Sequence, residues 1–355
     1  MPVLVAILAV MAFGFAGGKE DEVLTVDHPK IRKAIEVQEA ATPGFMAVED
    51  VLGTAVAQDD DGEMSIVVYV NLEGKNPAKT FKDIPGEIRG VRVRPEITEP
   101  FRSLVGKPTA GASHTERQTP PIQLGTSGGW RYDLANGYCC GGTLGSLVQK
   151  GSTQYILSNY HVLEADIASG GNGRVAQVGD PVVQPGLIDV GCNANNTQNV
   201  ASLSGIKSLP GNNVDAAIAP VTSGMVRSDG SILEIGTISA STVGAFINQA
   251  VKKSGRTTGL SRSAVSGLNA TVNVAYDNEC AGGAAFTKTY TGQIIIGNRG
   301  SRFLNSGDSG SLMVEDIATN PRAVGLLFAG SSTLAVANPI GEVLTFLGAT
   351  MVGVQ

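Results

Sequence analysis

The sequence has little of what nucleic-acid-binding and metal-binding proteins usually contain. Only 3 of its 355 residues are His, and 26 basic residues stand against 32 acidic ones. A net charge of −6 without a long Lys/Arg run does not suit a protein that grips phosphate groups, so we expect no nucleic-acid partner. No GxGxxG stretch opens a helix after a strand, so nucleotide binding is set aside.

Cysteine is also scarce, and its spacing fits no zinc pattern, so we expect neither a metal nor a cofactor. The four cysteines are Cys139, Cys140, Cys192 and Cys280. An exported protein would join them in one or two disulfides. A bridge between adjacent Cys139 and Cys140 would be strained, so we expect at least one of them to pair with Cys192 or Cys280. Buried free thiols are the alternative.

One long uncharged stretch stands at the N-terminus, where residues 3–18 precede Lys19. Its 16 residues are short for a membrane span, which needs about 20, so we expect no stable span. An apolar run that ends in small residues is typical of a secretory signal peptide. We interpret residues 1–18 in this way and expect a secreted or extracytoplasmic protein. A buried N-terminal helix is the alternative, because no Lys or Arg precedes the run.

The chain divides by its apolar patterns into two regions joined by a polar segment. In residues 19–105, "HPKIRKAIEVQEA" has helical spacing, while "VLGTAVAQ", "MSIVVYVNL" and "GVRVRPEI" are strand-like. These patterns predict a small α+β domain. Residues 106–137 lose periodicity and are rich in Pro, Gly, Ser and Thr, which predicts a linker. From residue 138 to 355, short apolar runs alternate with glycine-rich breaks, as in an antiparallel β-sandwich or barrel.

The stretch "NSGDSGSL" contains a candidate nucleophile, Ser309, although Gly, Asp and Ser are also the ordinary residues of turns. A serine hydroxyl needs a base within hydrogen-bond reach, and the base needs an orienting acceptor. His28 precedes a proline and His114 lies in the polar linker. His161 follows the strand-like "YILSN", where a base would be held rigidly. His161 is therefore the candidate base.

Asp215 is the candidate acceptor for His161, because it opens the apolar run "DAAIAPV". A charge that leads a buried strand is costly unless it is paired. The order His161, Asp215, Ser309 is that of chymotrypsin-type enzymes. Three rival carboxylates stand nearer to His161 in more polar surroundings, where solvation explains them: Asp166, Asp180 and Asp189.

Four segments, which follow one another along the chain in the order that the family has, resemble the trypsin-like serine peptidases. The resemblance is greatest to secreted bacterial members such as α-lytic protease and the streptogrisins. "GDSGS" resembles the nucleophile loop, "LSNYHVL" the histidine segment and "NNVDAAIA" the aspartate segment, and "KSGRTTGLSRSAVSG" resembles a further bacterial segment. The resemblance covers residues 138–350 and does not extend to residues 19–130. It implies two antiparallel six-stranded β-barrels of the chymotrypsin type, preceded by the small α+β domain.

The resemblance implies a serine endopeptidase that hydrolyses protein or peptide substrates through an acyl-enzyme. His161 would take the proton of Ser309, and Asp215 would hold His161. The backbone N–H groups of Gly307 and Ser309 would form the oxyanion hole. Asp308 is interpreted as a structural acid, since no Ile-Val-Gly-Gly-like start occurs, and Arg256 receives no catalytic role.

The predicted substrate site lies on the strand after the nucleophile. The backbone of Phe328, Ala329 and Gly330 would pair with an extended substrate. Phe303 would lie near the base of the primary pocket and favour a small or apolar side chain over Lys or Arg. The effect of Ser311, where relatives usually have glycine, stays open.

Residues 19–105 have two interpretations. They resemble in position the pro-region of secreted relatives, which contacts and blocks the peptidase domain, or they form a permanent accessory domain. Two other functions stay open for the chain, a catalytically inactive binding or regulatory protein on a peptidase fold and an esterase that uses the same triad.

Overall fold

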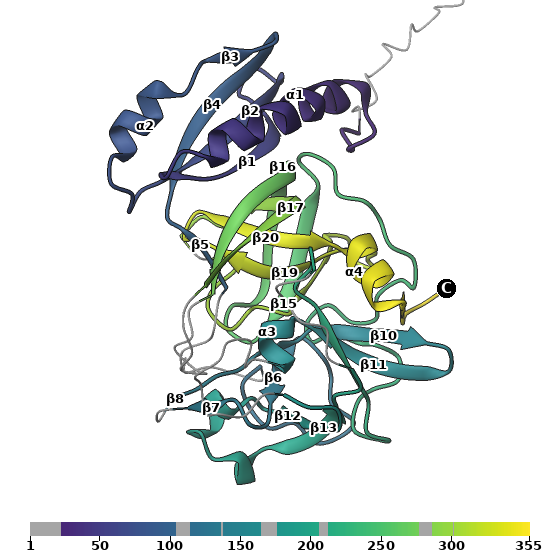
Figure 1. Ribbon diagram of the computed structural model, residues 1–355. Coiled ribbons are helices and arrows are strands. Elements are labelled where there is room, and N and C mark those ends of the chain that lie inside the picture. The colour runs from purple at the N-terminus through teal and green to yellow at the C-terminus, as the bar shows by residue number, and fades with distance from the viewer. Residues whose placement is uncertain are drawn as a thin grey trace, which may run out of the picture.

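Figure 1 shows the chain as a computed structural model, and its fold is mainly β with few helices, as predicted. A small N-terminal α+β unit lies above a larger β structure. The structure describes residues 23–103, 114–135, 138–164, 176–205, 212–276, 286–300 and 302–355.

The N-terminal unit packs helix α1 (Pro29–Met46) on a small sheet. His28 ends the preceding turn, and its Nδ1 accepts from the N–H of Lys30 at 3.3 Å, which caps the helix. β1 and β2 pair antiparallel, and β2 pairs parallel with β4 after a crossover through α2. The other elements of this unit are β1 (Val51–Gln58), β2 (Met64–Asn71), α2 (Pro77–Asp83), β3 (Glu87–Ile88), β4 (Val91–Thr98) and β5 (Phe101–Ser103).

The N-terminal unit is joined to the larger part through backbone pairing. β1 pairs antiparallel with β16 (Gly259–Tyr276), with Gly53 opposite Val272, so one sheet of eleven strands runs through both parts. Gln38 on α1 donates to the carbonyl of Asn269 at 3.1 Å and thereby ties the helix to β16. In Figure 1 the long strands β16 and β17 (Phe286–Gly297) reach up to this unit.

The C-terminal half is a ring of six paired strands. The pairing order is β15–β18–β19–β20–β17–β16, and β15 also pairs with β16, so the ladder returns to its first strand. The remaining bounds are β15 (Ala250–Gly255), β18 (Leu312–Glu315), β19 (Ala323–Gly330), β20 (Leu334–Pro339) and α4 (Ile340–Leu347).

The preceding half has two four-stranded sheets, β14-β11-β10-β21 and β13-β12-β6-β9, where one six-stranded barrel was predicted. An isolated bridge between Ala201 and Val221 joins them. β9 and β10 are separated at Gly145, where a Cβ would lie 2.0 Å from the carbonyl oxygen of Gly310. The strand is therefore interrupted where another loop crosses it. The bounds are β6 (Thr126–Trp130), β7 (Leu134–Ala135), β8 (Tyr138–Cys139), β9 (Gly142–Leu144), β10 (Ser146–Lys150), β11 (Thr153–Ser158), α3 (Tyr160–Leu163), β12 (Pro181–Gln184), η1 (Leu187–Val190), η2 (Ala194–Asn196), β13 (Gln198–Ser202), β14 (Ala217–Pro220) and β21 (Thr350–Met351).

Much of the segment predicted as a linker, residues 106–137, is packed into this half. Ile122 and Leu124 are buried and form isolated β-bridges to residues 226 and 232. Trp130 is buried at the end of β6, and its Nε1 donates to Asp180 at 3.0 Å. The segment is polar in composition, but its few apolar residues are buried in the core. Because these residues are widely spaced, they form no periodic pattern in the sequence. Where the boundary between the two parts falls stays a prediction.

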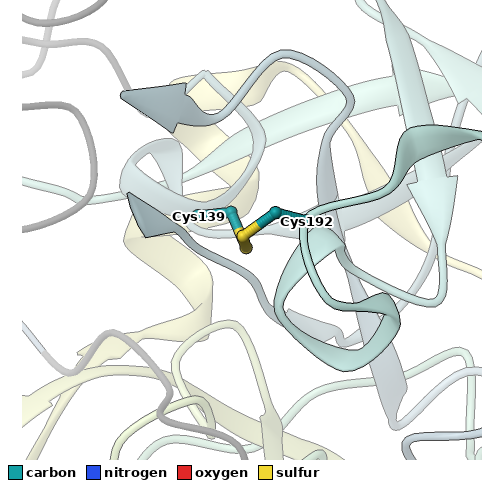
Figure 2. Close-up of a disulfide and its surroundings, with 2 residues drawn as sticks. All are labelled: Cys139 and Cys192. Carbon is teal, nitrogen blue, oxygen red and sulfur yellow. A yellow bond between two sulfur atoms is a disulfide. The ribbon is translucent and has the colours of Figure 1, made fainter. Parts of the chain in front are cut away.

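A disulfide joins Cys139 to Cys192, so one of the two adjacent cysteines pairs with Cys192, as predicted (Figure 2). It ties β8 to the turn after η1. Cys280 and the predicted signal peptide at residues 1–18 lie outside the described residues. Within the described part of the chain, no helix is long and apolar enough to cross a membrane.

Candidate active site

Strand pairing brings His161 and Asp215 together. β11 pairs antiparallel with β14, with Ser158 opposite Ala217, so the residues just beyond this register are neighbours. His161 lies on the short helix α3 after β11. Its Nδ1 lies 2.6 Å from Asp215 Oδ2, and its backbone N–H donates to Asp215 Oδ1 at 3.3 Å. The predicted base and the predicted acid are thus hydrogen-bonded.

Asp215 is fully buried, and both its backbone and its carboxylate form hydrogen bonds. Its backbone N–H donates to Asn338 Oδ1 at 2.9 Å, and its carbonyl accepts from Asn159 Nδ2 at 2.7 Å. The hydroxyl of Tyr276 donates to Asp215 Oδ2 at 2.8 Å. The sequence patterns did not indicate these three partners.

The two other histidines have partners of their own. His28 caps α1. His114 is buried, with Nδ1 2.8 Å from the carbonyl of Gly125 and Nε2 2.7 Å from Glu234 Oε2. Neither therefore competes with His161 for Asp215.

The rival carboxylates are engaged elsewhere. Asp180 accepts from Trp130. The side chain of Asp189 is 5% exposed and accepts two bonds from Arg256, from Nε at 2.8 Å and from Nη2 at 2.5 Å. Solvation therefore does not explain Asp189, contrary to the sequence-based interpretation, because a buried arginine balances its charge. Asp166 lies outside the described residues.

The loop that carries Ser309 is a tight turn that depends on glycine. Gly307 has φ of +95° and Gly310 has φ of +91°, a region that L side chains rarely adopt. A Cβ at Gly310 would lie 2.2 Å from Ser158 Oγ and 2.3 Å from the carbonyl oxygen of Thr143. The turn therefore fits closely against the strands that precede His161.

Thr143 links the Ser309 loop to the histidine segment. Its N–H donates to the Ser309 carbonyl at 2.9 Å, and its own carbonyl accepts from Ser158 Oγ at 2.7 Å. Its hydroxyl donates to the Gly307 carbonyl at 2.9 Å. Two hydrogen bonds thus connect Ser309 with a residue three positions before His161.

The hydroxyl of Ser309 does not bond to His161 in this structure. Ser309 is fully buried, and its Oγ donates to the carbonyl of Phe328 at 3.3 Å. His161 Nε2 is buried and has no hydrogen-bond partner among the described residues. The backbone N–H groups of Gly307 and Ser309, the predicted oxyanion donors, also donate to no acceptor in the described part of the chain.

Asp308 shapes the loop, in agreement with its interpretation as a structural acid. It is fully buried and accepts from the N–H groups of Thr257 at 2.9 Å and Thr258 at 3.1 Å. Its Oδ1 also forms an ion pair at 3.2 Å with the buried Lys253. Burial lowers the pKa of Lys253, and the charge of Asp308 opposes that shift. The segment "KSGRTTG" therefore supports the Ser309 loop through its hydrogen bonds and ion pair with Asp308.

Ser311 also supports the turn, which answers the question that the sequence left open. Its hydroxyl donates to the Asp308 carbonyl at 2.5 Å and is fully buried. A Cβ at Gly255 would lie 2.3 Å from Ser311 Oγ. Ser311 therefore fills a space that a glycine at position 255 leaves open.

The predicted substrate strand is occupied by the chain itself. Ala329 and Gly330 of β19 pair antiparallel with Ser103 and Arg102 of β5. The Phe328 ring is buried and lies edge-on to Tyr290, with centroids 4.8 Å apart.

Phe303 is buried at 2% exposure in an apolar cluster with Met313 and Leu327. Its carbonyl accepts from Ser261 Oγ at 2.9 Å. Its predicted place at the base of a substrate pocket stays a prediction.

A second buried carboxyl lies near Asp215. Glu164, one helical turn after His161, is 1% exposed, and its Oε2 has no hydrogen-bond partner within the described residues. Burial, and next the charge of Asp215, raise the pKa of Glu164 to about 8. The group is therefore neutral at neutral pH and adds no second charge beside Asp215.

No group of three or more His, Cys, Asp or Glu side chains in the described ranges is placed to hold a metal ion.

In comparisons with known structures, the fold is similar to that of chymotrypsin-fold serine proteases. A serine protease specific for glutamic acid aligns with 18% identity and a TM-score of 0.43, over 65% of this chain and 100% of that one. Protease A of Thermobifida fusca aligns with 21% identity and a TM-score of 0.41, over 65% and 98%. The chymotrypsin of Cellulomonas bogoriensis has 20% identity, a TM-score of 0.38 and the same coverage.

Comparison of the sequence with family models and with curated proteins gives one match. Residues 212–337 match the family model of the Nal1 C-terminal domain, a range that includes Asp215 and Ser309 but not His161. No curated protein matches the chain.

The geometry predicts that Gly310→Ala destroys the Ser309 loop. The new Cβ would overlap the Thr143 carbonyl and force an alanine into positive φ, so we expect a loss of more than about 4 kcal/mol of folding free energy. Gly151→Ala is the control, since Gly151 has φ of +57° with nothing within 4 Å, and we expect a loss of only about 1–2 kcal/mol. Urea unfolding of both variants gives the comparison, and equal losses would contradict the close fit.

Proposed function

We propose that the chain is a serine endopeptidase that uses Ser309, His161 and Asp215. The observation that carries this proposal is the 2.6 Å bond between His161 Nδ1 and the buried Asp215, which leaves His161 Nε2 without a partner among the described residues. The loop of Ser309 packs on Ser158, three residues before His161. Because a carboxylate only accepts, Nδ1 carries the proton and Nε2 is the basic nitrogen.

The proposed reaction begins when the Ser309 hydroxyl turns from the Phe328 carbonyl toward His161 Nε2. His161 takes the hydroxyl proton while Ser309 Oγ attacks the peptide carbonyl, and Asp215 stabilises the imidazolium. The unpaired N–H groups of Gly307 and Ser309 would receive the oxyanion. His161 returns the proton to the leaving amine, and a water molecule activated in the same way releases the acid and restores Ser309.

The substrate in this proposal is an extended peptide that pairs with β19. Ala329 and Gly330 already pair with a strand of the N-terminal unit, which supports their ability to bind a peptide backbone. A small or apolar side chain at the cleaved residue stays the expected preference.

The N-terminal unit, in the same proposal, is a pro-region that keeps the enzyme latent until it is removed outside the cytoplasm. Arg102 and Ser103 occupy the strand where a substrate would pair, and Ser309 has no exposed surface in this arrangement. A permanent accessory domain in this position would block the site permanently, so the pro-region is the better interpretation.

A non-catalytic binding protein is the second candidate, because the Ser309 hydroxyl bonds to Phe328 and not to His161. That bond is compatible with catalysis, since hydrogen bonds between catalytic groups often form only with substrate. An esterase with the same triad would act on esters and leave proteins intact.

We expect the protein freed of residues 23–103 to hydrolyse casein, and Ser309→Ala or His161→Ala to lower kcat/KM by roughly 10⁴-fold or more. Ser306→Ala, in the same loop, is the control and keeps its activity. Parallel assays on casein and a short-chain ester separate the classes. Activity on the ester alone would favour an esterase, and no activity on either would favour the binding protein.

Latency predicts the N-terminus of the active protein. Because His114, Ile122 and Leu124 are packed into the larger part, we expect the mature chain to begin within residues 106–113. Mass spectrometry of active protein gives the position, and a start near Lys19 would contradict the pro-region.

Latency also predicts that β5 can be loosened by mutation. Arg102→Pro removes a backbone donor from β5 and should raise the activity of the uncleaved chain. Arg102→Ala keeps the backbone donor and should stay latent. Equal activity of the two variants would show that β5 does not block the site.

A further inference from the structure

Two tyrosines extend the His161–Asp215 pair into a longer chain of hydrogen bonds. Tyr276 OH lies 2.8 Å from Asp215 Oδ2 and 2.5 Å from Tyr290 OH. Both tyrosines belong to the hairpin of β16 and β17, not to the segments that carry the proposed triad. We propose that Tyr276 is a positioning residue that fixes the Asp215 carboxylate, and that Tyr290 orients Tyr276. This inference rests on the proposed function for its catalytic consequence.

The hydrogen bonds in this chain have only one consistent direction. An ionised Asp215 only accepts, so the single hydroxyl proton of Tyr276 points to Asp215 Oδ2. Tyr276 must then accept from Tyr290. A hydroxyl that accepts a bond becomes a stronger donor, so Tyr290 strengthens the bond from Tyr276 to Asp215.

The tyrosines stay protonated and can serve only as donors to Asp215. Tyr276 is 1% exposed and Tyr290 has no exposed surface. Burial, followed by the charge of Asp215, raises the pKa of both hydroxyls well above the ordinary value. The hydroxyl of Tyr276 therefore neutralises part of the carboxylate charge without carrying a charge of its own.

Ring packing fixes the position of the two hydroxyls. Tyr276 stacks on Phe286 with centroids 4.9 Å apart and an interplanar angle of 6°. Tyr290 lies edge-on to Phe328, whose carbonyl accepts from Ser309. The ring of His161 lies edge-on to Tyr276 at 6.0 Å. The network therefore touches both the base and the strand that holds the nucleophile's hydroxyl.

The hairpin that carries the tyrosines is also where the N-terminal unit attaches. Phe101 of β5 pairs with Val274, two residues before Tyr276. Gly53 of β1 pairs with Val272, which is opposite Tyr290 in the β16–β17 ladder. Tyr276, which bonds to Asp215, thus lies on β16, the strand with which β1 and β5 of the N-terminal unit pair.

Other ionisable groups near Asp215 are Glu164 and Lys288. Glu164 is mostly neutral at neutral pH because burial and then Asp215 raise its pKa to about 8. Lys288 places its Nζ 4.9 Å from the Tyr290 ring centroid, and burial lowers its pKa while Asp215 opposes the shift. Measurements between pH 5 and 6.5 therefore keep Glu164 neutral.

The test is Tyr276→Phe in the full chain and in the chain freed of residues 23–103. Loss of the Tyr276 donor leaves the negative charge of Asp215 less stabilised by hydrogen bonds. His161 then compensates that charge more strongly, which favours its imidazolium form. We expect kcat/KM to fall roughly 10- to 100-fold and the acidic limb of its pH profile to move to higher pH. Tyr290→Phe should give a smaller change in the same direction, and Tyr155→Phe, on β11 outside this network, should give none.

A second readout does not need activity. The Nδ1 proton of His161, identified by its absence in His161→Ala, should change its ¹H chemical shift in Tyr276→Phe and not in Tyr155→Phe. An unchanged resonance, or a fall in kcat/KM with an unmoved pH profile, would overturn the positioning role. If the wild-type enzyme proves inactive while the resonance moves as expected, the proposed function fails and the positioning of Asp215 stands. Should Tyr276→Phe fail to fold, Tyr290→Phe decides by the same two readouts.

Discussion

The buried carboxylate of Asp215 determines how the centre of this molecule is built. A charge without exposed surface is strongly unfavourable unless donors surround it, and its donors here come from separate parts of the chain. His161 donates from α3 and Tyr276 from β16, while Asn338 accepts from the Asp215 backbone. Pairing one carboxylate thus holds the strand β14, the helix α3 and the C-terminal ring in a fixed relation.

Two buried ion pairs fix the Ser309 loop in a similar way. Lys253 pairs with Asp308 inside the loop, and Arg256 pairs with Asp189 below it. Both cations come from one short segment, Lys253–Arg256, which is therefore tied to the loop and to Asp189. Removing one partner of such a pair leaves a buried charge and typically costs about 3–5 kcal/mol, a large part of the roughly 5–15 kcal/mol by which domains are stable. The two ion pairs therefore stabilise the turn, whose positive φ values at Gly307 and Gly310 only glycine adopts readily.

Local patterns predicted much of the fold and part of the site. The strands "VLGTAVAQ" and "MSIVVYVN" begin and end where their apolar runs do, because alternating residues face two buried surfaces. The contact of His161 with Asp215 could be predicted because a charge at the head of a buried strand needs a partner. The contact of Tyr276 with Asp215 could not be predicted, since the two residues lie 61 positions apart. A tyrosine in an alternating strand is ordinarily interpreted as a core residue. The docking of Arg102 on Gly330 depends on long-range pairing, which no local pattern contains.

The central claim is that Ser309 is a nucleophile activated by His161 and covered by the N-terminal unit. The most direct test is to treat the full chain and a chain cleaved between Ser103 and His114 with a fluorophosphonate and to locate the adduct by mass spectrometry. The account predicts an adduct on Ser309 that forms much faster after cleavage and is absent in His161→Ala. An adduct on another serine, or none on Ser309 after residues 23–103 have been released, would contradict it.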